Sequence, residues 1–152
     1  MKPKWWEKSK RYISKKDKVM ARLIKSYKSH LTTRNNFFYS LTRSIVSQQI
    51  SVAAADSVFS KFEKKCKGKI NPKVVNKLSI TTLRKCGLSR LKAKGIKSLA
   101  KKILKKTFDP KLIKKMDDEE AILYLSGLRQ IGRWSSEMVL IFFYNRQNIW
   151  PI

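Results

Sequence analysis

Apolar residues recur three and four positions apart along most of this chain, and no segment alternates apolar and polar residues as a half-buried strand does. The clearest case runs from Leu125 to Leu140, where a helix is followed by a turn containing Gly132 and by a second helix from about Ser135 to Tyr144. The pattern predicts an all-α fold without internal repeats. The expected helices begin at or near Asp17, Asn36, Ser51, Asn71, Ile80, Ser89, Asp117 and Ser135.

Length and composition fit one globular domain. Of the 152 residues, 42% are hydrophobic, and no Gly-, Ser- or Pro-rich stretch separates two zones. We therefore expect a single, monomeric domain over residues 1–152. No apolar run reaches the roughly 18 to 20 residues that span a bilayer, and the charged start lacks the apolar segment of a secretion signal. These features predict a cytoplasmic protein that does not bind membranes.

The cysteines and the single histidine do not form a metal-binding pattern. Cys66 and Cys86 lack ligand spacing, and His30 cannot complete a site, so neither a metal nor another cofactor is expected. In a reducing cytoplasm, two buried thiols are favoured over a disulfide.

The chain is strongly basic, with 36 Lys and Arg against 10 Asp and Glu and a net charge of +26. Such a surface would bind a nucleic acid with a steep salt dependence. The alternative is nucleotide bias, as in an AT-biased bacterium, because Lys, Ile and Asn have codons rich in A and T. On the helix after Ser89, the lysines expected mostly to face solvent or phosphate are Lys92, Lys94, Lys97, Lys101 and Lys102.

The last two predicted helices form a hairpin at about residues 121–144. The first amides of a helix point outward and bind anions. We expect the backbone amides from Gly132 to Ser136 to face a DNA phosphate, with the Arg133 side chain alongside. The alternative is an ordinary corner between two helices. The acidic run from Asp117 to Glu120 predicts a capped helix start rather than an acid/base pair.

Three motifs occur in order along the chain. They are Ser47-Gln48-Gln49-Ile50-Ser51, the segment from Leu83 to Ser89 with Lys92 following, and the segment from Gln130 to Met138. Together they resemble the helix-hairpin-helix DNA glycosylase superfamily and, within it, the 3-methyladenine DNA glycosylase II (alkylbase glycosylase) branch. The resemblance extends from about Lys8 to Ile152. It implies base excision repair on double-stranded DNA, in which the N-glycosidic bond of alkylated purines such as 3-methyladenine is hydrolysed.

The resemblance also assigns residues that would contact DNA. The hairpin would hold the phosphate backbone through Ile131, Gly132, Arg133, Ser135 and Ser136. The loop with Gln48, Gln49 and Ser51 would supply a wedge, above all Gln49, that enters the duplex as the damaged base leaves it. The alternative for the two glutamines is a solvated helix end.

Trp134 occupies the position where bifunctional relatives carry a Schiff-base lysine. Its presence implies a monofunctional enzyme that uses water, with Trp134 and Met138 lining a pocket for a cationic base. The alternative for Trp134 is packing beneath the hairpin, and core packing is equally plausible for Met138.

Two departures from the family pattern stand out. Gln130 fills the first Gly position of the hairpin. The family's catalytic Asp is expected just after Ile152, so this chain is expected to be truncated before that residue and inactive by itself, and Glu137 would at best flank the pocket. Two alternatives stay open: an inactive helix-hairpin-helix DNA-binding protein, and a monofunctional mispair glycosylase of the same superfamily.

Overall fold

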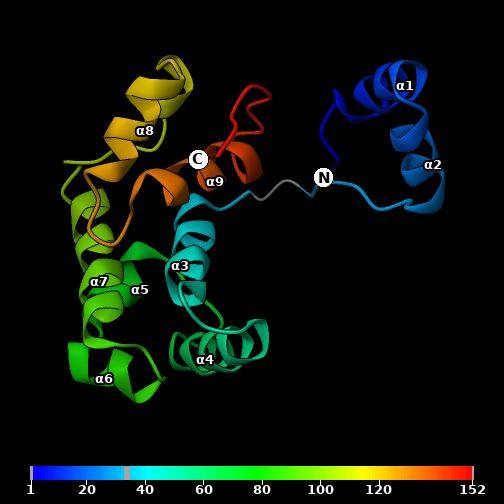
Figure 1. Ribbon diagram of the computed structural model, residues 1–152. Coiled ribbons are helices and arrows are strands. Elements are labelled where there is room, and N and C mark those ends of the chain that lie inside the picture. The colour runs from blue at the N-terminus through cyan, green and yellow to red at the C-terminus, as the bar shows by residue number, and fades with distance from the viewer. Residues whose placement is uncertain (1, 33–34, 152) are drawn as a thin grey trace. The chain divides into compact units, whose positions relative to one another are not determined.

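The computed structural model describes residues 2–32 and 35–151, and the chain forms two compact units, Met1–Asn35 and Asn36–Ile152. The sequence led us to expect one unit over residues 1–152. Among the described residues, the members of the hydrophobic core all come from Phe37 onward. The two units are visible in Figure 1.

The first unit is a pair of packed helices, α1 (Trp6–Lys16) and α2 (Lys18–Ser26). The Asp17 carboxylate caps α2 by accepting hydrogen bonds from the amides of Val19 and Met20, at 2.7 and 2.9 Å. This confirms the helix predicted from Asp17. No side chain of either helix, both described in full, is buried. Helix α1 was not predicted, because its few apolar residues do not form a clear stripe.

The second unit contains the other helices. Their bounds are α3 (Phe37–Ser47), α4 (Val52–Lys65), α5 (Pro72–Lys77), α6 (Ile80–Lys85), α7 (Arg90–Leu104), the 3-10 helix η1 (Leu112–Lys115), α8 (Asp118–Ser126) and α9 (Arg133–Phe142). Side chains cap most of these helices as the sequence predicted, and the capping box of Asp117 and Glu120 is present. Across residues 2–32 and 35–151 there is no strand, which confirms the all-α class.

Helices α3 and α7 contact each other in the middle of the second unit (Figure 1). Helix α3 also contacts α4 and α9, while α7 also contacts α5 and α6. The contacting helices α8 and α9 are anchored by aromatic packing: the ring of Phe37 lies 5.5 Å from that of Phe143, and the ring of Phe108 lies 4.8 Å from that of Tyr124. The α8–α9 hairpin therefore rests on the same core as α3.

The two cysteines are free and buried, as expected. Burial raises the pKa of the Cys66 thiol to about 11 and also raises the pKa of Cys86. Among the described residues, no helix is both long enough and apolar enough to cross a membrane.

Three of the lysines expected to face solvent or phosphate instead bond to backbone carbonyls. The ammonium group of Lys92 donates to Val46 and Gln48, that of Lys97 donates to Asn76 and Leu78, and that of Lys102 donates to Gly127. The prediction was wrong for these side chains because a long lysine stem can reach the end of a neighbouring helix.

Candidate nucleic-acid interface

The turn between α8 and α9 leaves the start of α9 open. Gly132 precedes α9 with an extended backbone, no described side chain caps the helix, and a Cβ built on Gly132 would meet nothing within 4 Å. The first amide bonded within the helix is that of Ser136, which donates to the Gly132 carbonyl at 3.0 Å. The amides of residues 133–135 thus have no acceptor within the helix, as the anion-site hypothesis requires.

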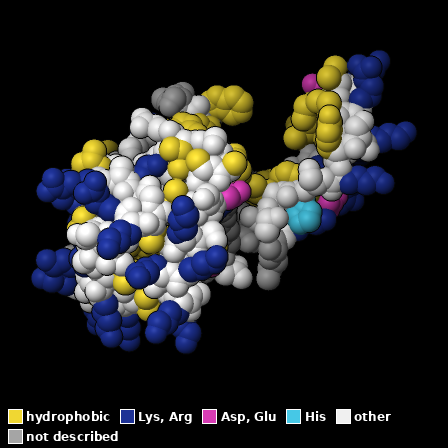
Figure 2. All heavy atoms as spheres, turned by 90° about the horizontal axis from the view of Figure 1, so that it is seen from below, with side chains coloured by type: hydrophobic (Ala, Val, Ile, Leu, Met, Phe, Trp, Pro, Cys, Tyr) yellow, Lys and Arg dark blue, Asp and Glu magenta, His cyan; other side chains and the backbone are white. Residues whose placement is uncertain are grey.

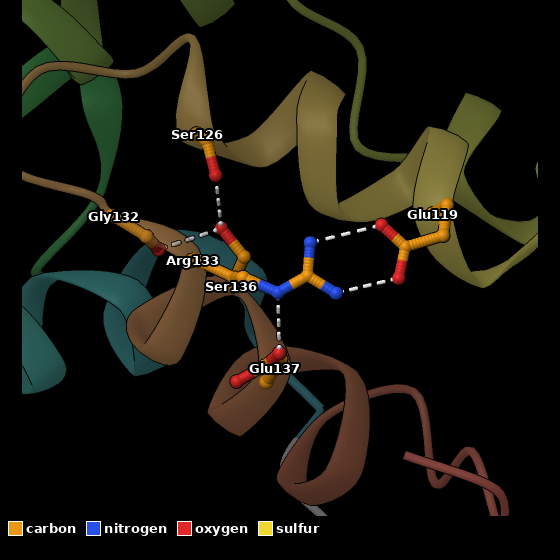
Figure 3. Close-up of polar contacts among 6 residues, drawn as sticks. All are labelled: Glu119, Ser126, Gly132, Arg133, Ser136 and Glu137. Carbon is orange, nitrogen blue, oxygen red and sulfur yellow. Dashed lines mark hydrogen bonds and ion pairs between the residues drawn. The ribbon is translucent and has the colours of Figure 1, made fainter. Parts of the chain in front are cut away.

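The Ser136 hydroxyl group near the start of α9 makes hydrogen bonds within the protein. Ser136 Oγ donates to the Gly132 carbonyl at 2.9 Å and lies 3.1 Å from Ser126 Oγ, which links α8 to α9 (Figure 3). Ser135 and Ser136 are both buried, as is Ile131 in the turn. Any contact of these residues with DNA would therefore use the backbone rather than the side chain.

Arg133 is placed differently from the expectation that it faces a phosphate. Its Nη1 and Nη2 atoms lie 2.9 and 2.5 Å from the two carboxylate oxygens of Glu119, and its Nε lies 3.1 Å from Oε1 of Glu137 (Figure 3). The hydrogen bond from Arg133 lowers the pKa of Glu119. Two carboxyl groups therefore surround one guanidinium beside the start of α9.

Glu137 is a buried carboxylate, only 1% exposed. Its Oε2 atom has no hydrogen-bond partner among the described residues. Glu137 follows Trp134 by three positions, so the two residues lie on neighbouring parts of the α9 surface. The sequence suggested only a flanking position and did not indicate the pairing with Arg133.

The loop between α3 and α4 meets the hairpin turn through Gln48. The side-chain Nε2 of Gln48 donates to the Gln130 carbonyl at 2.8 Å and lies 3.4 Å from Ser135 Oγ. Gln49 is exposed and has a left-handed backbone, with φ of 55°. Ser51 caps α4 by accepting from the amide of Ala54 at 3.3 Å. The three residues of this motif therefore differ in position. Gln48 bonds to the hairpin turn, Gln49 is exposed, and Ser51 caps α4.

Trp134 is 57% exposed on the first turn of α9, and Met138 is half-buried one turn further along. A Trp134 ring exposed to this extent is not packed beneath the hairpin, which was the alternative to a pocket position. The two residues are four positions apart and so lie on one side of α9, and their place in a base pocket stays a prediction.

Sequence reasoning missed Gly95 of α7. A Cβ at Gly95 would lie 2.8 Å from Cγ of Gln130 and 3.1 Å from the carbonyl oxygen of Arg129, so only glycine lets α7 approach the hairpin this closely. Gln130 itself has φ of 70°, the left-handed region that favours glycine. A glycine in the middle of a predicted helix was the available signal.

The distribution of Lys and Arg side chains does not by itself identify the DNA-binding site. On the face of the second unit seen in Figure 2, Lys and Arg side chains are spread widely rather than gathered in one patch. The geometry of the hairpin and of the α3–α4 loop is the more specific feature.

Comparison with known proteins gives a consistent set of relatives. The chain is 36% identical over 115 residues to the alkylbase DNA glycosidase-like protein mag2 of Schizosaccharomyces pombe, covering 73% of this chain and 54% of the relative. It is 29% identical over 138 residues to DNA-3-methyladenine glycosylase 1 of the same yeast, covering 88% of this chain and 60% of the relative. The chain thus spans little more than half the length of these curated relatives.

Solved structures share the fold. One is the 3-methyladenine DNA glycosylase of the same yeast in complex with abasic DNA, at a TM-score of 0.77 and 28% identity, covering 95% of this chain and 73% of that one. Another is a DNA-3-methyladenine glycosidase from Bacillus halodurans, at a TM-score of 0.75 and 27% identity, covering 80% of this chain and 57% of that one.

The family model of the HhH-GPD superfamily of base excision DNA repair proteins matches residues 42–151, a span that holds all three motifs and the hairpin. These findings confirm the resemblance to the helix-hairpin-helix glycosylases, with relatives named for 3-methyladenine and alkylbase substrates. The chain belongs to the HhH-GPD superfamily of base excision DNA repair proteins.

Proposed function

We propose that this chain forms the DNA-binding part of a monofunctional glycosylase that removes alkylated purines such as 3-methyladenine from the chromosomal DNA of a bacterial nucleoid. The observation that carries the proposal is the exposed Trp134 on the first turn of α9, beside uncapped backbone amides. An aromatic face attracts a cationic alkylated base, and the adjacent amides suit the phosphate of the same nucleotide. The names of the yeast relatives support this substrate class.

Two groups would hold the DNA. The amides of residues 133–135 would bind a phosphate, while Arg133 stays engaged with Glu119 and Glu137. Gln49, exposed beside the braced Gln48, would fill the stack vacated by the extruded base. Met138 would form a second wall of the base pocket.

Hydrolysis of the glycosidic bond needs a carboxylate near the sugar. The bond between C1′ and the base nitrogen breaks, a cationic sugar forms, and water adds to C1′. Glu137, the carboxylate one turn from Trp134, is buried and paired with Arg133, which suits it poorly to activating water. The 152 residues alone are therefore expected to bind alkylated or abasic DNA without releasing the base.

The test combines binding and release. Fluorescence anisotropy should show tighter binding to a duplex with an abasic-site analogue than to the undamaged duplex. Alkylated DNA incubated with the chain should release no 3-methyladenine, while the yeast DNA-3-methyladenine glycosylase 1 serves as the positive control. Equal binding to both duplexes would contradict the proposed recognition of damaged DNA. Release of the base would contradict the expectation that these 152 residues alone are inactive.

Trp134→Ala separates a pocket role from a structural one. We expect it to remove the preference for a duplex that carries a cationic alkylated purine over the undamaged duplex, lowering the affinity for the alkylated duplex by about tenfold, while undamaged DNA binds as before. Phe142→Ala, a truncated aromatic that is also exposed at the far end of α9, is the matched control and should keep the preference. Equal losses on both duplexes would mean that Trp134 only supports the hairpin.

A second candidate is a DNA-binding protein without any glycosylase activity. The pairing of Glu137 with Arg133 favours it, because a carboxylate near the proposed pocket is committed to an ion pair. Damage-selective binding supports a glycosylase-derived pocket, whereas tight binding that ignores damage supports the second candidate.

A further inference from the structure

We infer that Gln48 is a positioning residue that couples the hairpin turn to the exposed Gln49, an inference that rests on the proposed DNA-binding function. Gln48 lies 82 positions before Gln130, and the side-chain contact between them joins the two segments proposed to meet DNA. Gln48 therefore acts through Gln49, without itself entering the duplex.

The side chain of Gln48 is held on the hairpin side. Its Nε2 atom donates to the Gln130 carbonyl at 2.8 Å and lies 3.4 Å from Ser135 Oγ, so both amide hydrogens have an acceptor within reach. The acceptor on Gln130 belongs to a residue in the left-handed conformation, which is unfavourable for a residue with a side chain. The hydrogen bond helps to stabilise that turn.

The backbone of Gln48 is held from the opposite direction. Its carbonyl accepts a hydrogen bond from the ammonium group of Lys92 at 2.7 Å, and the same ammonium donates to the Val46 carbonyl at 2.9 Å. Burial lowers the pKa of Lys92, in agreement with its enclosed position. Gln48 is thus fixed by α7 through its main chain and by the hairpin through its side chain.

This double attachment decides what Gln49 can do. Gln49 follows directly, is exposed, and has φ of 55°, so the chain turns sharply at the first residue beyond the anchor. A side chain presented from a fixed backbone loses less conformational freedom when it inserts between bases. Binding of a phosphate at the hairpin therefore places Gln49 at a set position relative to that phosphate.

The experiment uses the full chain and a duplex with 2-aminopurine at the target position. Gln48→Met keeps the length of the side chain but removes its donors, and Gln49→Met is the matched variant. Because Gln48→Met removes both contacts of the side-chain amide, we expect it to lower the unstacking signal at saturating protein by about fivefold, with less than about a twofold change in Kd. The doubly substituted chain should resemble Gln49→Met alone.

Additive losses in the double variant would overturn the inference, because they would mean that Gln48 contacts DNA independently. A parallel loss of affinity and unstacking in Gln48→Met would also overturn it. Gln48→Asn keeps the amide on a shorter stem and should give the same pattern in weaker form, which covers the case in which Gln48→Met does not fold.

Hydrogen exchange on the free protein tests the coupling without DNA. In Gln48→Met, amides of both segments, residues 47–51 and 128–134, should exchange faster, whereas Gln49→Met should change neither. If only one segment responds, or neither, the coupling is absent. Failure of the unaltered chain to bind any duplex would instead reject the proposed function, so the two failures can be told apart.

Discussion

Arg133 and Glu119 form a two-point ion pair between the start of α9 and the first turn of α8, with nitrogen–oxygen distances of 2.9 and 2.5 Å. The pair places an exposed carboxylate next to backbone amides that are suited to an anion. Glu119 therefore holds the Arg133 guanidinium away from a phosphate bound at these amides, and its own negative charge repels that phosphate.

Glu119→Gln should strengthen DNA binding. The substitution removes a negative charge at the hairpin and releases two donors of Arg133, so we expect a two- to fivefold lower Kd at low salt and a salt slope steeper by about one counterion. Titrations at several salt concentrations measure both quantities.

The control is Asp56→Asn, which changes the net charge equally and frees Arg43 of α3 from its own ion pair. If both variants gain the same affinity, the effect reflects total charge, and the proposed role of the hairpin fails this test.

Arg133→Met should destabilise the protein more than Glu137→Gln does. Without Arg133, the buried Glu137 carboxylate loses its ion partner, and an unpaired buried charge is unfavourable. We expect a melting temperature lower by about 5 to 10 °C for Arg133→Met, and adding Glu137→Gln to it should restore most of the difference. Calorimetry or circular dichroism measures this, and a double variant no more stable than Arg133→Met would contradict the argument.

Gly95→Ala should be harmful although alanine is ordinarily the better helix former, by about 1 kcal/mol. The added Cβ would meet Gln130 Cγ at 2.8 Å and the Arg129 carbonyl oxygen at 3.1 Å, so α7 and the hairpin must separate. Both the melting temperature and the affinity for abasic DNA should fall.

The comparison is Gly127→Ala, where the nearest atom is 3.5 Å away and the backbone angle suits any residue. A gain in stability for Gly95→Ala would mean that the hairpin adapts without loss.

The Cys66 thiol gives a pH prediction. Its folded pKa is raised to about 11, above the ordinary thiol value, so the folded state favours the protonated form. This stabilisation is fully present below the unfolded pKa of about 8.5 and is lost as the pH rises through about 11. Stability should therefore decline between these values. Urea titrations of the unaltered chain and of Cys66→Ala, compared across this range, test it: an equally steep decline in both would contradict the assignment.

Many of the helix starts could be predicted from local signals in the sequence. Asn36, Ser51 and Ser89 each cap the helix they were expected to cap, because an oxygen two or three positions before an apolar run acts over a few residues. The turn at Gly132 and the helix after it were also predicted, although the helix begins at Arg133, two residues before the expected Ser135.

Contacts between distant segments could not be predicted in the same way. Gln48 and Gln130 are 82 positions apart, and Arg133 and Glu119 are 14 apart on different helices. Their pairing depends on how α3, α8 and α9 are packed, and a periodicity does not specify that packing. The expectation that the α7 lysines face outward failed for the same reason.

The tethered lysines of α7 separate two stages of an encounter with DNA. Lys92, Lys97 and Lys102 contribute to the long-range positive field that draws a duplex toward the protein, which raises the association rate. Their ammonium groups are already committed to carbonyls, so they add little to the residence time of the complex. Replacing Lys97 and Lys102 with Met, and keeping Lys92 because it holds the Gln48 backbone, should slow capture while leaving the dissociation rate nearly unchanged, a kinetic division that net charge alone does not reveal.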